Sequence, residues 1–152
     1  MKLDISVIGY VENNVDKQSD ENWGSIRSRI RLNNDYIDGL SGLADFSHAI
    51  ILTYFLHEAL FERDKHLQRH PRNLKEMPLV GIFSQRAKDR PNPIGLTAVK
   101  IIDVLKDSLL VEGLDAINGT PVLDIKPYYP QYDKVDDAIV PDWVNLLMEN
   151  YF

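Results

Sequence analysis

The sequence predicts a mainly β protein, either a single β-barrel or a strongly curved sheet, with one short helix near the C-terminus. Three observations support this prediction. Apolar and polar residues alternate with a period of two along much of the chain, about six segments resemble strands, and only one segment has clear helical spacing. The length of 152 residues suits one ordinary domain. We expect the barrel to occupy residues 1–137 and the helix, within residues 138–152, to pack on it.

The first half of the chain contains three of these strands. We predict them at Leu3–Gly9, Ser25–Leu32 and His48–Leu56, and we expect the polar residues 13–22 to form a loop. The second strand carries three arginines that share one face, namely Arg27, Arg29 and Arg31. We interpret that face as solvated and paired with acidic neighbours across the sheet. The third strand is a continuous apolar run, which fits a strand lining a barrel, with a short helix as the competing interpretation.

The middle of the chain is less regular. Residues 57–76 are charged and should form an irregular or partly helical connection. A short strand is expected at Leu79–Phe83. Two longer apolar segments, Gly95–Leu105 and Leu109–Leu114, predict a hairpin that turns at Lys106 and the two residues after it.

The C-terminal region combines a broken segment with the one helix. Two prolines exclude Pro127–Asp133 from the centre of a sheet. The helix begins at Pro141, a residue that suits the first turn. Its spacing places Trp143, Leu146, Leu147 and Asn150 on one face.

Composition excludes several classes of protein. With 44% hydrophobic and 26% charged residues, the chain has enough apolar mass to fold. The longest apolar stretch, Ala49–Leu56, is far shorter than the roughly 20 residues that span a bilayer, so we expect no membrane association. The chain has no cysteine and no signal-peptide core before the first strand, which favours a cytoplasmic location. The net charge of −6 excludes a uniformly basic coat but not a local basic patch, and Lys and Arg are concentrated between residues 63 and 90.

Familiar catalytic motifs are missing. The glycines form neither of the common phosphate-binding loops, and Ser47 lacks the context of a nucleophile elbow. His66 and His70 have the spacing of two metal ligands on a helix, but Pro71 follows directly. We therefore interpret these histidines as solvated loop residues and expect no metal.

The most unusual segment is Gly81–Leu96, GIFSQRAKDRPNPIGL. Pro91 and Pro93 fix the backbone on both sides of Asn92, and Gly95 permits a close backbone approach. The result is a stiff loop with several cations. Such a loop suits a flat or anionic ligand, because little conformational entropy remains to be lost on binding.

A second unusual segment runs from Asn118 to Asp133. Asn118-Gly119 is a strong turn signal, and exposed backbone amides at such a turn could bind an adenine edge or a carboxylate. The tyrosines that follow could stack on a base or pack in the core with their hydroxyl groups at the surface.

Taken together, three blocks resemble the TsaA-like, or TrmO, methyltransferase family. They are Phe46-Ser-His, Gly81–Gln85 with Arg86 and the later Arg90-Pro-Asn-Pro-Ile-Gly-Leu, and Gly119-Thr-Pro-Val-Leu-Asp-Ile-Lys-Pro-Tyr. The resemblance covers about residues 1 to 133. It implies an S-adenosylmethionine-dependent methyltransferase on a β-barrel, which acts as a homodimer. It also implies a tRNA substrate, methylated at N6 of threonylcarbamoyladenosine next to the anticodon.

The resemblance also implies site residues. The cofactor contacts carried over onto this chain are His57, Glu58, Arg86, Leu96, Asn118, Gly119, Thr120 and Pro121. A fixed guanidinium such as Arg86 suits the cofactor carboxylate, and Glu58 suits its amine. Candidates for a base at the acceptor nitrogen are Asp124, His57 and a water molecule oriented by a phosphate, of which we select Asp124. The candidates for substrate contact are Lys88, Arg90, Asn92, Lys126 and Tyr128.

The chain departs from the family pattern at three places. The segments at Glu12–Asn14 and Trp23–Arg27 differ from the usual family residues, and Asn118 stands where the family usually has Asp. Three alternatives therefore stay open. They are a methyltransferase for another small or RNA acceptor, a non-catalytic RNA- or nucleotide-binding barrel, and a metal or acid–base hydrolase that uses His57, Glu58, His66 and His70.

Overall fold

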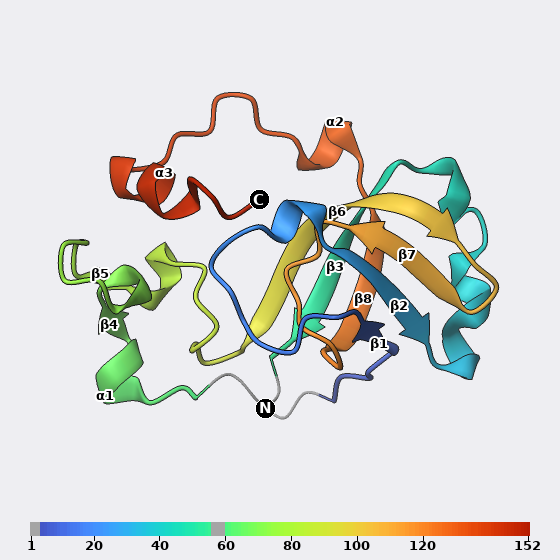
Figure 1. Cartoon of the computed structure of the whole chain (residues 1–152), viewed down its shortest axis with the longest axis horizontal. Coiled ribbons are helices and arrows are strands. Elements are labelled where there is room, and N and C mark those ends of the chain that lie inside the picture. Colours follow the sequence, from blue (N-terminus) through green and yellow to red (C-terminus); the bar gives the residue numbers. More distant parts are fainter. Residues whose placement is uncertain (1–3, 56–59) are drawn as a thin grey trace.

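The computed structural model describes residues 4–55 and 60–152. Six antiparallel strands close into a barrel in the order β1-β2-β7-β6-β3-β8 (Figure 1). The strands are β1 Gly9–Glu12, β2 Arg27–Leu32, β3 His48–Tyr54, β6 Ile94–Val104, β7 Ser108–Glu112 and β8 Pro121–Pro127. The predicted barrel is confirmed, and so is the hairpin of β6 and β7.

The barrel core follows from the alternation of side chains along each strand. In β2 and β3 every second residue is buried, so Ile30 and Ile51 have no exposed surface. The arginine face of β2 points outward, and Arg27 pairs with Glu112 while Arg31 pairs with Glu12 and Asp107. The interpretation of that face as solvated and acid-paired is therefore correct for two of its three arginines.

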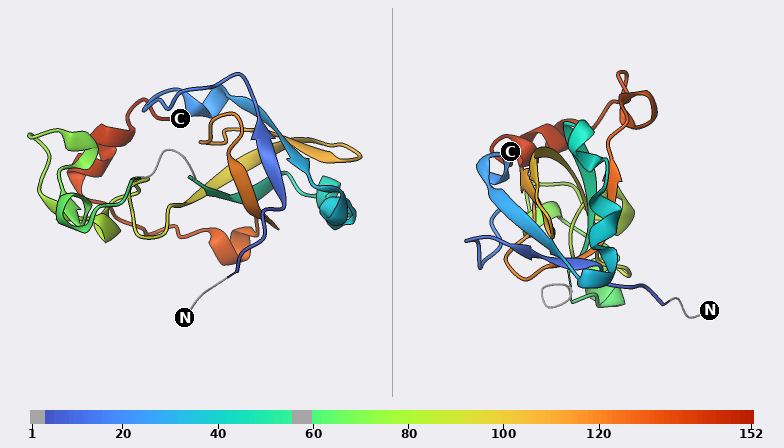
Figure 2. Two further views of the ribbon diagram at one scale, coloured as in Figure 1. Left: turned by 90° about the horizontal axis from the view of Figure 1, so that it is seen from below. Right: turned by 90° about the vertical axis from the view of Figure 1, so that its right-hand side faces the viewer.

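A small unit lies beside the barrel. The two-residue strands β4 Gln68–Arg69 and β5 Val80–Gly81 pair with each other next to helix α1 Arg63–His66. Helix α3 Asp142–Met148 lies next to this unit in both views (Figures 1 and 2), and α2 Pro130–Asp133 follows β8. The short 3-10 turns are η1 Trp23–Ser25, η2 Asn34–Leu40, η3 Leu43–Asp45, η4 Pro71–Asn73 and η5 Ile82–Ser84. The predicted domain boundary after residue 137 stays a prediction.

Strand registers define two ends of the barrel. At one end β3 finishes opposite the start of β6, with Tyr54 paired to Ile94. β8 begins at the same end, and we call it the polar end. At the other end β3 begins and β8 finishes, with Ala49 paired to Pro127, and η2 and η3 lie between β2 and β3. We call it the apolar end.

Two predicted strands are wrong, and one strand was not predicted. The first strand is not Leu3–Gly9: pairing starts at Gly9, where a Cβ would lie 2.3 Å from the Arg31 carbonyl oxygen. The alternation of apolar and polar residues does not show how far the neighbouring strands extend, so it cannot show where pairing begins. Leu79–Phe83 is no barrel strand, because after Val80–Gly81 the chain turns into η5, and Leu79 and Phe83 are both exposed.

The third error is the missed strand β8, which occupies the place in the barrel that Leu79–Phe83 does not. Its pairing with β3 shifts between Leu52 and Thr53, so Leu123 is an extra residue at a bulge. The bulge interrupts the period-two pattern from which a strand would be recognised. In α3 the predicted face is also only partly correct, because Leu146 is exposed whereas Trp143 and Leu147 are half-buried.

Candidate functional site

Arg86 lies against an open strand edge at the polar end. β6 pairs with β3 along Ile94–Lys100, but β7 covers its other edge only from Lys100 onward. Arg86 fills part of the uncovered edge, where its Nη2 donates to the Leu96 carbonyl oxygen. No other described residue accepts a hydrogen bond from this exposed guanidinium. The remaining N–H groups can therefore bind an anion.

The basic loop after Arg86 is held by Asp89. This carboxylate accepts hydrogen bonds from Arg69 Nη1 at 3.0 Å, Lys88 Nζ at 2.9 Å and the Leu60 amide at 3.1 Å. Burial works to raise the pKa of Asp89, but the hydrogen bonds from Lys88, Leu60 and Arg69 outweigh it and hold that pKa below its usual value. Asp89 thereby joins the loop to the residue that follows the segment with His57 and Glu58.

The predicted substrate residues of this loop have different environments. Arg90 Nη1 donates to the Gln85 carbonyl oxygen at 2.9 Å and so stabilises its own loop. Lys88 is paired with Asp89. Asn92 is exposed between its two prolines. The expected close approach at Gly95 is confirmed, because a Cβ there would lie 2.4 Å from Thr53 Oγ1.

Leu96 and Asp124 share the outer face of the barrel. The register places Leu52 of β3 between Leu96 of β6 and Asp124 of β8. Leu96 and Asp124 are therefore two strands apart, about 10 Å at the usual strand spacing. Leu96 is 49% exposed and the Asp124 side chain 42% exposed. Tertiary structure thus brings two predicted site residues onto one open surface.

Both carboxylate oxygens of Asp124 have partners. Oδ1 accepts a hydrogen bond from the Ile125 amide at 2.9 Å, and Oδ2 lies 2.6 Å from Lys126 Nζ. This hydrogen bond raises the pKa of Lys126. On the same strand face, Tyr128 contacts the ring of His48 edge-on, with ring centroids 6.4 Å apart. Lys126 and Tyr128 thus continue the surface that begins at Leu96.

The turn before β8 is bound within the chain. The amides of Asn118, Gly119 and Thr120 donate to the carbonyl oxygens of Val15, Val11 and Ile117. The hypothesis that these amides are exposed is therefore wrong. Asn118 Oδ1 accepts a hydrogen bond from the Asn13 amide at 3.2 Å. Asn118 and Gly119 present their surfaces at the polar end, whereas Thr120 and Pro121 are buried.

Two residues at the polar end were not predicted. Asp115 precedes the turn, and the Tyr151 hydroxyl donates to its Oδ2. Burial raises the pKa of the Asp115 carboxyl, and this outweighs the Tyr151 hydrogen bond and the positive charge of Arg86, which lower it. Only the position of Asp115 between two apolar residues could have indicated a special role in the sequence.

Four further candidates were predicted from the sequence, and two of them are described by the structure. His57 and Glu58 fall outside the described residues. His66 Nδ1 accepts a hydrogen bond from the Glu62 amide at 2.8 Å, and His70 Nδ1 contacts the Met77 carbonyl oxygen at 2.6 Å. Within residues 4–55 and 60–152, no three acidic or histidine side chains are grouped so that they could hold a metal ion. The expectation of no metal stays a prediction.

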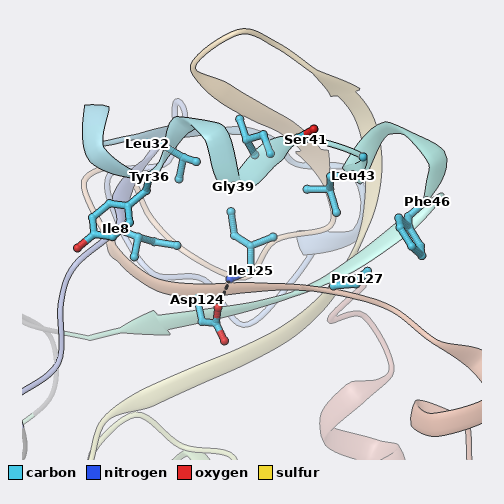
Figure 3. A pocket seen from close by; sticks show the side chains of 12 residues that line it. Ile8, Leu32, Tyr36, Gly39, Ser41, Leu43, Phe46, Asp124, Ile125 and Pro127 are labelled. Carbon is cyan, nitrogen blue, oxygen red and sulfur yellow. Dashed lines mark hydrogen bonds between the residues drawn. The ribbon is translucent and has the colours of Figure 1, made fainter.

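A pocket of about 430 Å³ opens at the apolar end. Its lining is mostly apolar and comes from η2, η3 and the ends of β2 and β8. Figure 3 shows Ile125 pointing into this pocket and Asp124 pointing away on the other side of the strand. Asp124 is therefore shared between the lining of this pocket and the outer surface that carries Leu96, and Leu96 itself does not line the pocket. None of the helices in the described part of the chain has the length and apolar character needed to cross a membrane.

Comparison with known proteins gives a consistent result. Residues 11–134 match the family model of the tRNA-methyltransferase O N-terminal domain. A probable S-adenosyl-L-methionine-binding protein of Methanothermobacter thermautotrophicus is 39% identical over 139 residues, which are 89% of this chain and 96% of that protein. The human tRNA (adenine(37)-N6)-methyltransferase is 38% identical over 120 residues, 76% of this chain and 26% of that protein.

Solved structures agree with the sequence relatives. A crystal structure of TrmO from P. aeruginosa superposes with a TM-score of 0.76 at 29% identity, covering 94% of this chain and 62% of that one. A second TrmO crystal structure gives 0.74 at 31% identity, covering 92% and 64%. This chain thus spans less than two thirds of either TrmO chain. The shared barrel and the match over residues 11–134 place this chain in the TrmO family of tRNA methyltransferases.

Proposed function

We propose that this protein transfers a methyl group from S-adenosylmethionine to N6 of threonylcarbamoyladenosine, next to the anticodon of a tRNA. The observation that carries the proposal is the arrangement at the polar end. An exposed guanidinium, Arg86, is fixed at a strand edge next to Leu96, and Leu96 shares its outer face with Asp124. The names of the relatives from M. thermautotrophicus and human support the cofactor and the reaction.

The residues fit this cofactor chemically. S-Adenosylmethionine carries an amino-acid group and a sulfonium that supplies an already activated methyl group. Arg86 retains N–H groups that can form a charge-assisted pair with the carboxylate. Leu96 and Leu52 offer an apolar surface beside it. No covalent nucleophile is required, so the contribution of the chain is to position the two reactants.

Asp124 is the proposed base. The N6–H of a carbamoylated adenosine is urea-like, and removing its proton makes the nitrogen a better nucleophile. Asp124 Oδ2 faces the outer surface in an ion pair with Lys126. Substrate would therefore have to exchange with Lys126 Nζ, and Lys126 could then bind a phosphate of the RNA.

The proposed RNA contacts lie around that surface. Lys126 is exposed, Asn92 is exposed on its rigid loop, and Tyr128 offers a ring. Lys88 and Arg90 take part in the loop structure and contribute positive potential there. RNA affinity should therefore fall as salt concentration rises.

The first experiment measures S-adenosylmethionine binding by calorimetry. Arg86→Ala should weaken binding about 10- to 100-fold, because a hydrogen-bonded charge pair is lost. Arg31→Ala is the matched control, since Arg31 lies on the outer face of β2, a strand not adjacent to β3, β6 or β8. Equal affinities for the three proteins would contradict the proposed cofactor site.

The second experiment measures transfer of a labelled methyl group to threonylcarbamoylated and to unmodified tRNA. Asp124→Asn should lower turnover by about 10²- to 10⁴-fold. Asp103→Asn is its control, because Asp103 Oδ1 makes the same bond to the next amide as Asp124 does. Unchanged turnover in Asp124→Asn would remove Asp124 as the base.

One observation favours the alternative of a non-catalytic RNA- or nucleotide-binding barrel. Both oxygens of Asp124 are already engaged, so this carboxylate can act as a base only after it loses one of its partners. In that case the wild type would bind the cofactor or tRNA without turnover. The labelled-methyl assay separates the two functions directly.

We also infer a homodimer in the cytoplasm. Exposed apolar side chains on the connection to α3 and on α3 itself, Ile139, Val140 and Leu146, are a surface that a second copy could cover. Light scattering at micromolar concentration should give twice the chain mass. A single-chain mass across that range would contradict the dimer.

A further inference from the structure

The segment Gly113–Ala116 closes the polar end of the barrel. Leu114 has no exposed surface and Ala116 is 3% exposed, and both belong to the core cluster. Gly113 has a φ of 90°, which lets the chain turn inward after β7. Asp115, between these two core residues, is half-buried, and its side chain contacts Tyr151 instead of the core.

Tyr151 is itself fixed from several sides. The Trp23 amide donates to the Tyr151 carbonyl oxygen at 2.8 Å, and the guanidinium carbon of Arg72 lies 5.7 Å from the Tyr151 ring centroid. Its hydroxyl therefore has a defined position at Asp115. This arrangement orients the carboxylate.

The carboxylate of Asp115 has a hydrogen-bond donor at one oxygen only and no paired cation among the described residues. The Tyr151 hydroxyl binds Oδ2, and no described residue donates a hydrogen bond to Oδ1. No Lys or Arg in the described part of the chain lies within the 4.0 Å that defines an ion pair with Asp115. Arg86 is near enough for its charge to act on this carboxyl, yet its guanidinium donates elsewhere, to Leu96. A half-buried carboxylate with one neutral donor gains much from an added cation.

We propose that Asp115 binds the α-ammonium group of the amino-acid part of S-adenosylmethionine, while Arg86 binds its α-carboxylate. This inference rests on the proposed function, and it assigns the ammonium group to Asp115 instead of Glu58, which lies outside the described residues. An α-amino acid carries its two charges on one carbon, and Arg86 with Asp115 presents the two opposite charges in one region of the polar end. Tyr151 is the positioning residue, because it holds Oδ2 and leaves Oδ1 for the ammonium group.

The proposal differs from a purely structural role for Asp115 in one testable way. An asparagine at this position keeps an oxygen that can accept the Tyr151 hydrogen bond, so the fold should not weaken. Removing an under-compensated buried charge should instead raise the melting temperature at pH 7. A residue that served only the fold would give a lower melting temperature.

The experiment compares three ligands by calorimetry. S-Adenosylhomocysteine carries both charged groups, its desamino analogue lacks the ammonium, and 5′-methylthioadenosine lacks the whole amino-acid group. In the wild type, loss of the ammonium should weaken binding about 10- to 100-fold. In Asp115→Asn, S-adenosylhomocysteine and its desamino analogue should bind equally, and 5′-methylthioadenosine should bind as in the wild type. Tyr151→Phe should show a smaller loss for S-adenosylhomocysteine alone, and Asp107→Asn, an exposed carboxylate at the apolar end, should show none.

The outcomes separate the two proposals. If the wild type binds none of the three ligands, the proposed cofactor site fails. If the wild type binds S-adenosylhomocysteine but Asp115→Asn still discriminates against the desamino analogue, only the role of Asp115 is overturned. Equal losses for S-adenosylhomocysteine and 5′-methylthioadenosine in Asp115→Asn, with a lower melting temperature, would also overturn it in favour of a structural role.

Discussion

The two ends of the barrel differ in what they offer a ligand. The apolar end has a pocket of about 430 Å³ with a mostly hydrocarbon lining. The polar end presents charged and amide groups, namely Arg86, Asp115 and Asn118. All the described cofactor residues implied by the family resemblance belong to the polar end or to the outer face that continues from it.

This difference shows that the volume of a pocket does not by itself identify the cofactor site. Among the described residues that line the pocket, Asp124 is the only charged one, so the pocket offers no cation for the carboxylate of a sulfonium amino acid. Arg86 and Asp115 are the groups that we propose for the charges of this amino acid, because neither forms an ion pair with a described residue. A site on an open strand edge is also accessible to a large RNA.

The largest loss of stability is expected where a core side chain that closes one end of the barrel is shortened. Leu114→Ala should lower the free energy of unfolding by about 2–5 kcal/mol, because Leu114 fills the polar end with no exposed surface. Leu43→Ala should cost less, since Leu43 already borders the open pocket. Urea denaturation measures both values. A larger loss of unfolding free energy for Leu43→Ala than for Leu114→Ala would contradict the conclusion that the polar end is the more tightly packed of the two.

The next effect concerns the loop behind Arg86. Asp89→Asn should lower the free energy of unfolding by about 1–3 kcal/mol, because Asp89 accepts three hydrogen bonds and its side chain is only 14% exposed. Cofactor affinity should fall as well, since the loop orients Arg86. Asp64→Asn, on the exposed surface of α1, is the control.

Asp89 and Asp115 should also give opposite pH dependences of stability. The folded pKa of Asp89 is lowered, so its contribution is present above its unfolded pKa of about 3.9 and is lost as pH falls through the folded pKa. The folded pKa of Asp115 is raised, so its ionisation destabilises the fold as pH rises from about 3.9 through the folded pKa. Unfolding curves of Asp89→Asn and Asp115→Asn against pH check both signs. Parallel curves for the two variants would contradict this assignment.

A smaller effect is expected at the family departure, Asn118. Asn118→Asp should change stability by less than about 0.5 kcal/mol, since aspartate can also accept the Asn13 amide. Asn118→Ala should cost about 1 kcal/mol through loss of that bond. Cofactor affinity should change little in Asn118→Asp, because the side-chain oxygen is directed at Asn13. A clear gain in affinity would show that the family carboxylate serves the cofactor directly.

The smallest effect is expected at the apolar end. Ser41→Leu adds hydrocarbon to the pocket at an exposed position with β-like backbone angles. Affinity for S-adenosylmethionine and methyl transfer should stay within twofold of wild type. A loss of cofactor affinity or of methyl transfer would contradict the distinction between the two ends and would indicate that the pocket takes part in the reaction.

The sequence alone predicts the mainly β class, the hairpin of β6 and β7, and the outward arginine face of β2, but it leaves open whether the sheet closes into a barrel. These follow from a period of two, which depends only on neighbours along the chain. The stiff loop around Asn92 and the close approach at Gly95 were also predictable, because proline and glycine act locally.

Which segments close the barrel, and which side chains come into contact, depends on packing between distant parts of the chain. Because of the bulge opposite Leu52, β8 lacks the regular alternation by which a strand is recognised in a sequence. The residues of Leu79–Phe83 do not show that this segment pairs outside the barrel. The placement of Asp124 beside Leu52 and Leu96 depends on strand register, and the contact of Tyr151 with Asp115 joins residues 36 positions apart. Such contacts are set by packing between distant segments, which periodicity and motif spacing do not encode.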